Sequence, residues 1–141
     1  MRVTFIGHRD APDNIYPLVK ATVINLIEKH NANTFYIGTH GNFDKIAHSV
    51  MKEVSANYNG LTIYTVLAYM PQKTKQSLLS AFETILPEDV ATSIPKFAIS
   101  KRNIWMINNS DTVIAYVKRG YGGAVKARNL AIAKNKNVIT L

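Results

Sequence analysis

The chain has 141 residues and no cysteine, and its 17 lysines and arginines exceed its 9 aspartates and glutamates to give a net charge of +8. This length suits one domain, and the missing thiols exclude disulfides and cysteine-ligated metal sites. No apolar run approaches the roughly 20 residues that span a bilayer, and the first residues lack the apolar region of a signal peptide. We therefore expect a single cytoplasmic domain over residues 1–141, with no membrane partner and with an anionic ligand favoured by the charge.

Short apolar strands alternate with amphipathic helices along most of the chain. Strands are predicted over residues 2–6, 34–37, 61–68, 112–117 and 137–141. Helices are predicted over residues 16–29, 46–54, 100–109 and 124–134. Three prolines interrupt this rhythm between residues 69 and 96, where we expect an irregular excursion with a short helix around residues 76–85.

Strands that alternate with helices are typical of a parallel sheet that is covered by helices on both faces. Right-handed crossovers leave few arrangements of such a sheet. We predict an α/β fold, a Rossmann-like three-layer α/β/α sandwich with a mainly parallel five-stranded sheet in the order 3-2-1-4-5. Ligands of such sheets bind outside the carboxyl ends of the strands, where the strand order reverses. In this topology that point lies between the first and fourth strands.

Three glycine-bearing loops follow strands and are expected to meet at this point: residues 7–10, 38–44 and 118–123. Glycine allows close approach of the backbone to a phosphate, and a helix N-terminus offers free N–H groups. The loops therefore favour a phosphate-bearing ligand. The glycine spacing matches neither the dinucleotide fingerprint nor the P-loop, so these glycines can equally serve only to form turns.

Several charged side chains in the predicted loops have two interpretations each. Arg9 can hold a phosphate or carboxylate, or it can pair with Asp10. Asp44 can begin a helix or accept a hydrogen bond from a ribose hydroxyl. Lys101 and Arg102 open a helix at the end where cations are disfavoured, which indicates that one of them has another purpose.

We expect no metal and no cofactor, because His8 and His40 lie in neighbouring loops without a third suitable ligand. Tyr69 and Trp105 can stack on a base, although Trp105 fits the core equally well. The apolar pair Val50 and Met51 can serve a homo-oligomer or the core. The predicted ligand-binding residues are Gly7, His8, Arg9, Gly38, Thr39, Gly41, Asp44, Lys101, Arg102, Tyr116, Gly122 and Gly123.

A family resemblance rests on the order and spacing of several short segments. These are residues 5–9, the loop 38–44 with its Asn-Phe-Asp end, residues 100–103 and 111–116, and Gly122-Gly123 before an alanine-rich helix. Together they resemble the SLOG superfamily, which joins DNA-processing proteins of the Smf/DprA type with the lonely-guy phosphoribohydrolases. The small bacterial YpsA-like branch is the most similar.

The resemblance implies a Rossmann-like fold that binds nucleotides, nucleosides or ADP-ribose-like molecules, and in some members hydrolyses an N-glycosidic bond. Other members sense nucleotide signals in stress or phage defence. By position, the ligand would be lined by Gly7, Arg9, Gly38, Asp44, Gly122 and Gly123. The chain departs from the phosphoribohydrolase pattern P-G-G-x-G-T-x-x-E, since Val125 and Lys126 replace its glycine and threonine. Asn129 stands at its catalytic glutamate, so hydrolysis by that route is not expected.

Three functions follow from these observations. The first is a non-catalytic sensor or sequestering module for a small-molecule nucleotide-type ligand, such as a nucleoside phosphate, an ADP-ribose-like molecule or a cyclic nucleotide. The second is an N-glycoside hydrolase of nucleoside monophosphates, with Asp44 as candidate catalytic residue. The third is nucleic-acid binding, which the sequence does not favour because the basic residues are spread out without an arginine-rich run.

Overall fold

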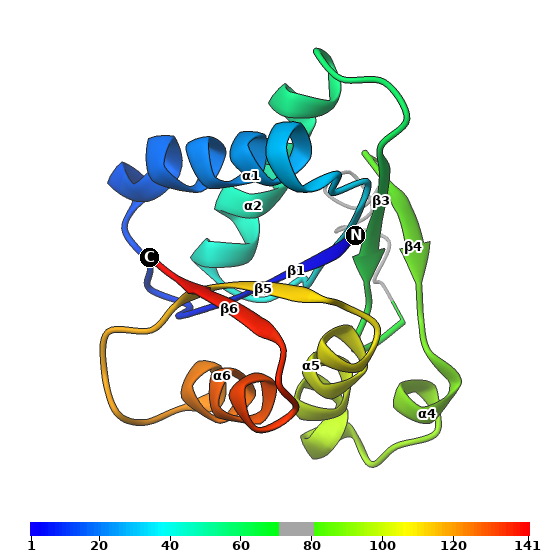
Figure 1. Cartoon of the computed structure of the whole chain (residues 1–141). Helices are drawn as coiled ribbons and strands as arrows, with labels where there is room; N and C mark the ends of the chain where they lie inside the picture. Colours follow the sequence, from blue (N-terminus) through cyan, green and yellow to red (C-terminus); the bar gives the residue numbers. More distant parts are fainter. Residues whose placement is uncertain (71–80) are drawn as a thin grey trace.

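The computed structural model describes residues 1–70 and 81–141, which form a sheet between two layers of helices (Figure 1). In these residues the strands are β1 (Arg2–Gly7), β2 (Thr34–Ile37), β3 (Thr62–Val66), β4 (Glu83–Ile85), β5 (Thr112–Tyr116) and β6 (Asn137–Thr140). Helices α1 (Tyr16–His30) and α2 (Asn42–Ser55) cover one face, and α5 (Ala98–Asn108) and α6 (Gly123–Ala133) cover the other. Short turns are η1 (Asp13–Ile15), α4 (Glu88–Ala91) and η3 (Pro95–Phe97). The predicted Rossmann-like α/β fold is confirmed.

The sheet has six strands among the described residues, in the order β4-β3-β2-β1-β5-β6, and all neighbouring pairs are parallel. The predicted number of five strands is therefore wrong, although the five predicted strands keep their relative order. Strand β4 adds an edge beside β3, with Tyr64 opposite Glu83. The predicted short helix around residues 76–85 is wrong where the chain forms β4. Residues 76–80 of that prediction lie outside the described residues. Strand β4 has only three residues, which are too few for hydrophobic periodicity to reveal a strand.

Two hydrophobic clusters occupy the two faces of the sheet, because successive strand residues point to opposite sides. Phe5 packs into the cluster under α1 and α2, and Ile6 packs into the cluster under α5 and α6. Val50 and Met51 are both 0% exposed, so they fill the core and do not serve an oligomer. None of the described helices combines the length and apolar character that a membrane span requires.

Trp105 is half-buried and packs against the cluster under α5 and α6. Its ring meets the Tyr36 ring edge-on, with the centroids 5.3 Å apart.

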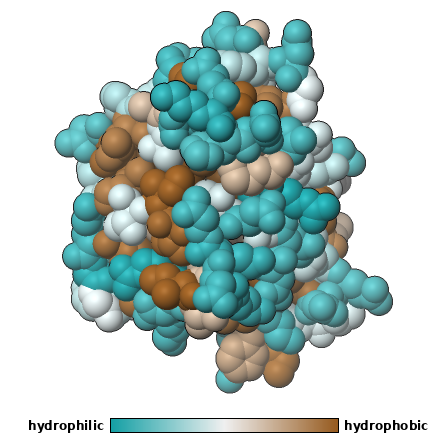
Figure 2. All heavy atoms as spheres, in the orientation of Figure 1, coloured by the Kyte–Doolittle hydropathy of each residue, from teal (hydrophilic) through white to brown (hydrophobic). Residues whose placement is uncertain are grey.

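On the face shown in Figure 2, hydrophobic residues gather at the left, near the edge strand β6. This is the edge at which Val138 and Ile139 are half-buried, and Ile132 of the adjoining α6 is 55% exposed. It is a different edge of the sheet from the carboxyl ends of the strands.

Two glycines start helices at the carboxyl edge of the sheet. Gly41 precedes α2 with φ 88° and ψ 177°, and Gly122 precedes α6 with φ 102° and ψ 178°. Only glycine adopts this conformation readily. A Cβ at Gly41 would lie 2.5 Å from the Cα of Arg9, whereas one at Gly122 would meet nothing within 4 Å.

We expect Gly41→Ala to destabilise the fold more than Gly122→Ala does. Both substitutions add about 1–3 kcal/mol of backbone strain, and Gly41→Ala adds a clash with backbone that costs about 1–3 kcal/mol more. The measurement is urea unfolding of both variants and the wild-type protein. Equal losses of unfolding free energy would contradict the close approach of the β1 and β2 loops.

Candidate functional site

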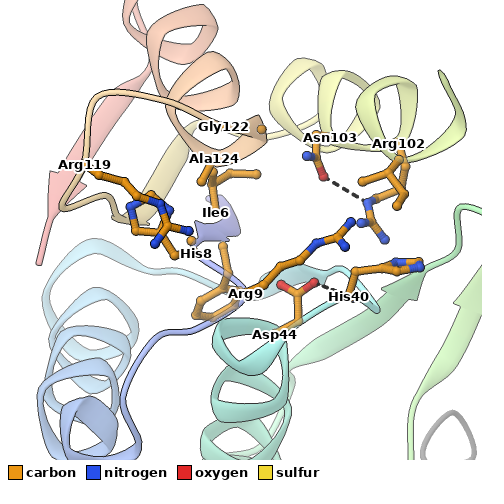
Figure 3. Close-up of a pocket in the computed structure, with 14 residues that line it drawn as sticks. Ile6, His8, Arg9, His40, Asp44, Arg102, Asn103, Arg119, Gly122 and Ala124 are labelled. Carbon is orange, nitrogen blue, oxygen red and sulfur yellow. Dashed lines mark hydrogen bonds between the residues drawn. The ribbon is translucent and has the colours of Figure 1, made fainter. Parts of the chain in front are cut away.

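A pocket of about 290 Å³ opens at the carboxyl ends of the strands, where the sheet order reverses between β1 and β5 (Figure 3). The loops after β1, β2 and β5 all contribute to its lining, and so does the first half of α5. The sequence prediction placed three glycine loops at this point, and the structure brings them together there. Arg102 of α5, which was also predicted to bind the ligand, lies in the same lining.

Seven of the twelve predicted ligand-binding residues line the pocket: Gly7, His8, Arg9, Asp44, Arg102, Gly122 and Gly123. The other five lie outside its lining: Gly38, Thr39, Gly41, Lys101 and Tyr116. Lys101 is exposed on α5, and Tyr116 stacks on Phe43 with ring centroids 6.1 Å apart. Thr39 supports the site from behind, because its hydroxyl accepts a hydrogen bond from Arg102 at 3.2 Å.

The glycines at the end of β1 and after β2 are needed for packing within the protein. A Cβ at Gly7 would lie 2.3 Å from the ring of Phe43. At Gly38 it would lie 2.7 Å from the Asp44 carboxylate and 3.0 Å from the Arg102 guanidinium carbon. Gly38 therefore makes room for two charged groups that are neighbours. The backbone stays open at Gly122 and Gly123, where an added Cβ would meet nothing within 4 Å.

Arg102 is the most deeply placed charge of the site, with 2% of its surface exposed. Its Nη1 donates to the carbonyl of Val66 at 3.1 Å as well as to Thr39, and its Nε donates to the Asn103 side chain at 3.0 Å. Within the described part of the chain its Nη2 donates no hydrogen bond. Burial lowers the pKa of Arg102, yet a guanidinium stays charged at neutral pH. Arg102 thus presents a free donor and a charge to the pocket.

Arg9 reaches across the pocket from the β1 loop towards Arg102 (Figure 3). Its guanidinium makes no hydrogen bond or ion pair among the described residues. The predicted alternative, a pair with Asp10, is wrong, because Asp10 pairs with Arg119 at 2.9 Å. Arg9 is exposed, so it is available to a ligand without the loss of an internal contact.

Asp44 lies in the first turn of α2, below the two guanidinium groups. Burial raises the pKa of its carboxyl to about 6, although Arg102, the N–H of His40 and Arg9 all oppose this rise. Its Oδ2 accepts the His40 N–H at 2.9 Å. A pKa near 6 means that the carboxyl is largely ionised at pH 7.5 and largely protonated at pH 5. The charge of the pocket therefore depends on pH.

We expect Asp44→Asn to make the protein more stable at pH 7.5 by up to about 3 kcal/mol, the equivalent of a pKa raised from 3.8 to about 6. The folded carboxyl holds its proton up to higher pH than the unfolded one. The stability of the wild-type protein therefore falls as the pH rises from about 4 through 6. Urea unfolding at pH 4 and 7.5 measures the difference, which should vanish at pH 4. A variant that is less stable than the wild type at pH 7.5 would contradict this account.

His8 is buried and holds two loops together. Its Nε2 accepts the N–H of Lys118 at 2.9 Å, so the ring proton lies on Nδ1. Burial lowers the pKa of His8, with a further contribution from Arg119, so the ring is neutral at pH 7. The described residues contain no cluster of three or more His, Cys, Asp or Glu side chains suited to a metal ion.

The predicted ligand-binding residues lack four lining residues that matter for the site, His40, Ile99, Asn103 and Arg119, although the predicted loops 38–44 and 118–123 contain two of them. A helical spacing could have revealed the other two. Ile99, Arg102 and Asn103 lie at positions i, i+3 and i+4 of α5 and share one face, whereas Lys101 does not. Asn129, at the position of the phosphoribohydrolase glutamate, is outside the pocket lining on α6. The alternative of an N-glycoside hydrolase with Asp44 as candidate catalytic residue therefore stays a prediction.

No model of a known protein family matches this sequence, and no curated protein is significantly similar to it. Among solved structures, DNA processing protein A (DprA) from Streptococcus pneumoniae matches with a TM-score of 0.73 and 17% identity, over 99% of this chain and 49% of that chain. DprA from Helicobacter pylori matches with a TM-score of 0.70 and 17% identity, over 99% of this chain and 64% of that one. The Helicobacter pylori protein binds single-stranded DNA.

This chain therefore spans less than two thirds of the length of either DprA structure. The similarity establishes that it has the Rossmann-like fold found in the DprA proteins. The Rossmann-like fold that the resemblance to the SLOG superfamily implies is confirmed. The YpsA-like branch stays a prediction, as do the cytoplasmic location and the oligomeric state.

Proposed function

We propose that this domain binds single-stranded nucleic acid and holds a phosphate group of the strand in the pocket between β1 and β5. The observation that carries the proposal is the meeting of two guanidinium groups with donors to spare. Arg102 keeps Nη2 free at 2% exposure, and Arg9 has no partner in the described residues. Guanidinium groups bind phosphate with two parallel, charge-assisted hydrogen bonds, so a phosphate is a suitable ligand for this pair.

The start of α6 adds to this attraction. Its first turn has no acidic residue and no side-chain cap, and its backbone is open at Gly122 and Gly123. The free N–H groups and the positive end of the helix dipole favour an anion there. The net charge of +8 draws a polyanion to the whole surface, which fits a nucleic acid.

The comparisons favour this third sequence hypothesis over the first. DprA from Helicobacter pylori is similar in fold and binds single-stranded DNA. A single strand can bend into a recessed pocket of about 290 Å³, whereas a stiff duplex cannot lower one phosphate to a buried arginine. We therefore expect single strands to bind more tightly than duplexes.

A second candidate is a free nucleotide-type ligand, such as a nucleoside phosphate, an ADP-ribose-like molecule or a cyclic nucleotide. The size of the pocket is compatible with a small ligand of this kind, since about 290 Å³ is at the lower end for small-molecule sites. This candidate uses the same guanidinium groups for its phosphate. It differs in that the affinity would come from one nucleotide and would not grow with the length of the strand.

The test is fluorescence anisotropy with dT20, the matching duplex, and mononucleotides as competitors, over a range of salt concentrations. We expect Arg9→Gln to weaken dT20 binding about tenfold and to lower the salt slope by about one. Arg2→Gln is the matched control, because Arg2 is an exposed arginine at the opposite end of β1. Equal effects of the two substitutions would contradict the proposed site. Competition by mononucleotides at the same concentration as dT20 would favour the second candidate.

A further inference from the structure

Arg102 lies at the bottom of the pocket. Its depth limits which phosphate of a strand can contact it. Only 2% of its surface is exposed, yet it lines the same cavity as Arg9 and Asp44. We propose that the pocket receives the terminal phosphate monoester at the end of a strand, and not an internal phosphodiester. This inference rests on the proposed function and names the part of the strand that the site recognises.

The positive groups of the pocket attract a dianion more strongly than a monoanion. Arg9 and Arg102 contribute two positive charges, the buried carboxyl of Asp44 offsets one of them at pH 7.5, and the uncapped start of α6 adds a partial positive charge. Arg119 also lines the pocket but is already paired with Asp10. A terminal phosphate carries a charge of about −1.5 to −2 at pH 7, whereas an internal phosphodiester carries about −1. The terminal group therefore gains more from the two neighbouring guanidinium groups.

The walls of the pocket favour a phosphate that is esterified to one sugar over a phosphate that is esterified to two. They come from four segments: the β1 loop at His8, the start of α2 at Asp44, the face of α5 at Asn103, and the start of α6 at Ala124. An internal phosphodiester has a sugar on each side, and both must leave the cavity. A terminal phosphate has a single ester arm and three oxygens that can accept hydrogen bonds from Arg102, Arg9 and the N–H groups of α6.

The same monoester occurs at a 5′ end, at a 3′ end and on a free mononucleotide, and the experiment separates these sources. Binding is measured for dT12 with hydroxyl ends, with a 5′-phosphate or with a 3′-phosphate, and for circular dT12 and dTMP. dT14 with hydroxyl ends controls for the added charge, because its two extra phosphodiesters supply about as much charge as one terminal phosphate.

We expect one of the end-phosphorylated strands to bind at least about tenfold more tightly than hydroxyl-ended dT12, dT14 or the circle. Arg9→Gln should remove most of this preference, and Arg2→Gln should preserve it. Arg9 has no internal partner in the described residues, so its variant tests the inference without a loss of folding. Arg102→Lys, checked for folding by circular dichroism, should also reduce the preference.

Three outcomes would overturn the inference, and they are distinct. End-phosphorylated and circular dT12 that bind within about twofold of each other would reject the terminal phosphate while leaving nucleic-acid binding intact. Binding of dTMP as tight as that of the phosphorylated strand would reject the strand end and favour a free nucleotide. Absence of binding by every oligonucleotide would reject the proposed function itself.

Discussion

Replacing Arg102 by glutamine is expected to weaken binding of single-stranded DNA roughly 100-fold, which is about 2.7 kcal/mol. The loss is large because a buried guanidinium that bonds a phosphate is worth more than an exposed one, on the order of 1.5–3 kcal/mol. Anisotropy titration with dT20 at fixed salt measures the change. The same substitution is expected to lower the free energy of unfolding by about 1–3 kcal/mol, because Val66 and Thr39 lose their donor.

The matched control is Lys101→Gln, one residue away on the same helix. It removes the same charge from an exposed side chain that lies outside the pocket lining. We expect Lys101→Gln to weaken binding by less than about threefold, because it lowers only the overall positive electrostatic potential of the protein. The two titrations use variants that are shown to be folded at the assay temperature. Similar losses for Lys101→Gln and Arg102→Gln would mean that the basic surface binds DNA without using the pocket.

Affinity for the strand is expected to rise about tenfold between pH 7.5 and 5.5, relative to the same change in Asp44→Asn. The carboxyl of Asp44, with its pKa at about 6, is ionised at the higher pH and repels a phosphate beside Arg9 and Arg102. Protonation removes this repulsion, so binding takes up a proton and tightens as the pH falls. The ratio of the two proteins cancels any titration of the ligand itself.

The measurement is the dissociation constant of both proteins for dT20 at half-unit pH steps. Asp44→Asn should bind more tightly than the wild type at pH 7.5, and the two curves should meet near pH 5. Parallel curves would show that Asp44 does not face the bound phosphate. An affinity of the wild type that falls towards pH 5.5, relative to that of Asp44→Asn, would contradict the sign of the effect.

Much of the fold could be predicted because its signals are local. The strands β1, β2 and β5 are short apolar runs, and α1 and α2 carry their apolar residues on one face. Parallel order then follows from the alternation and the handedness of crossovers. Strand β4 could not be predicted in this way. Its three residues are mostly exposed, and its pairing with β3 comes from tertiary contact and not from its own pattern.

The location of the site was predictable, whereas its lining residues were predicted only in part. Ligands of open parallel sheets bind where the strand order reverses, and this rule located the pocket because it depends only on topology. Whether a glycine lies open to a ligand or under a side chain depends on packing, and Gly7 and Gly38 lie under side chains. The residue types likewise did not distinguish Lys101 from Arg102, and only the helical spacing with Ile99 and Asn103 separates the two. The three-dimensional position of α5 buries Arg102 and leaves Lys101 in solvent.

The most direct test of the central claim is a map of amide chemical-shift changes on titration of the ¹⁵N-labelled protein with 5′-phosphorylated dT12. We predict the largest changes at Gly7, Arg102 and Gly123, with smaller ones at the far end of β1 and along β6. Changes concentrated on β6 or spread evenly over the basic surface, with none at these three amides, would contradict a phosphate site between β1 and β5.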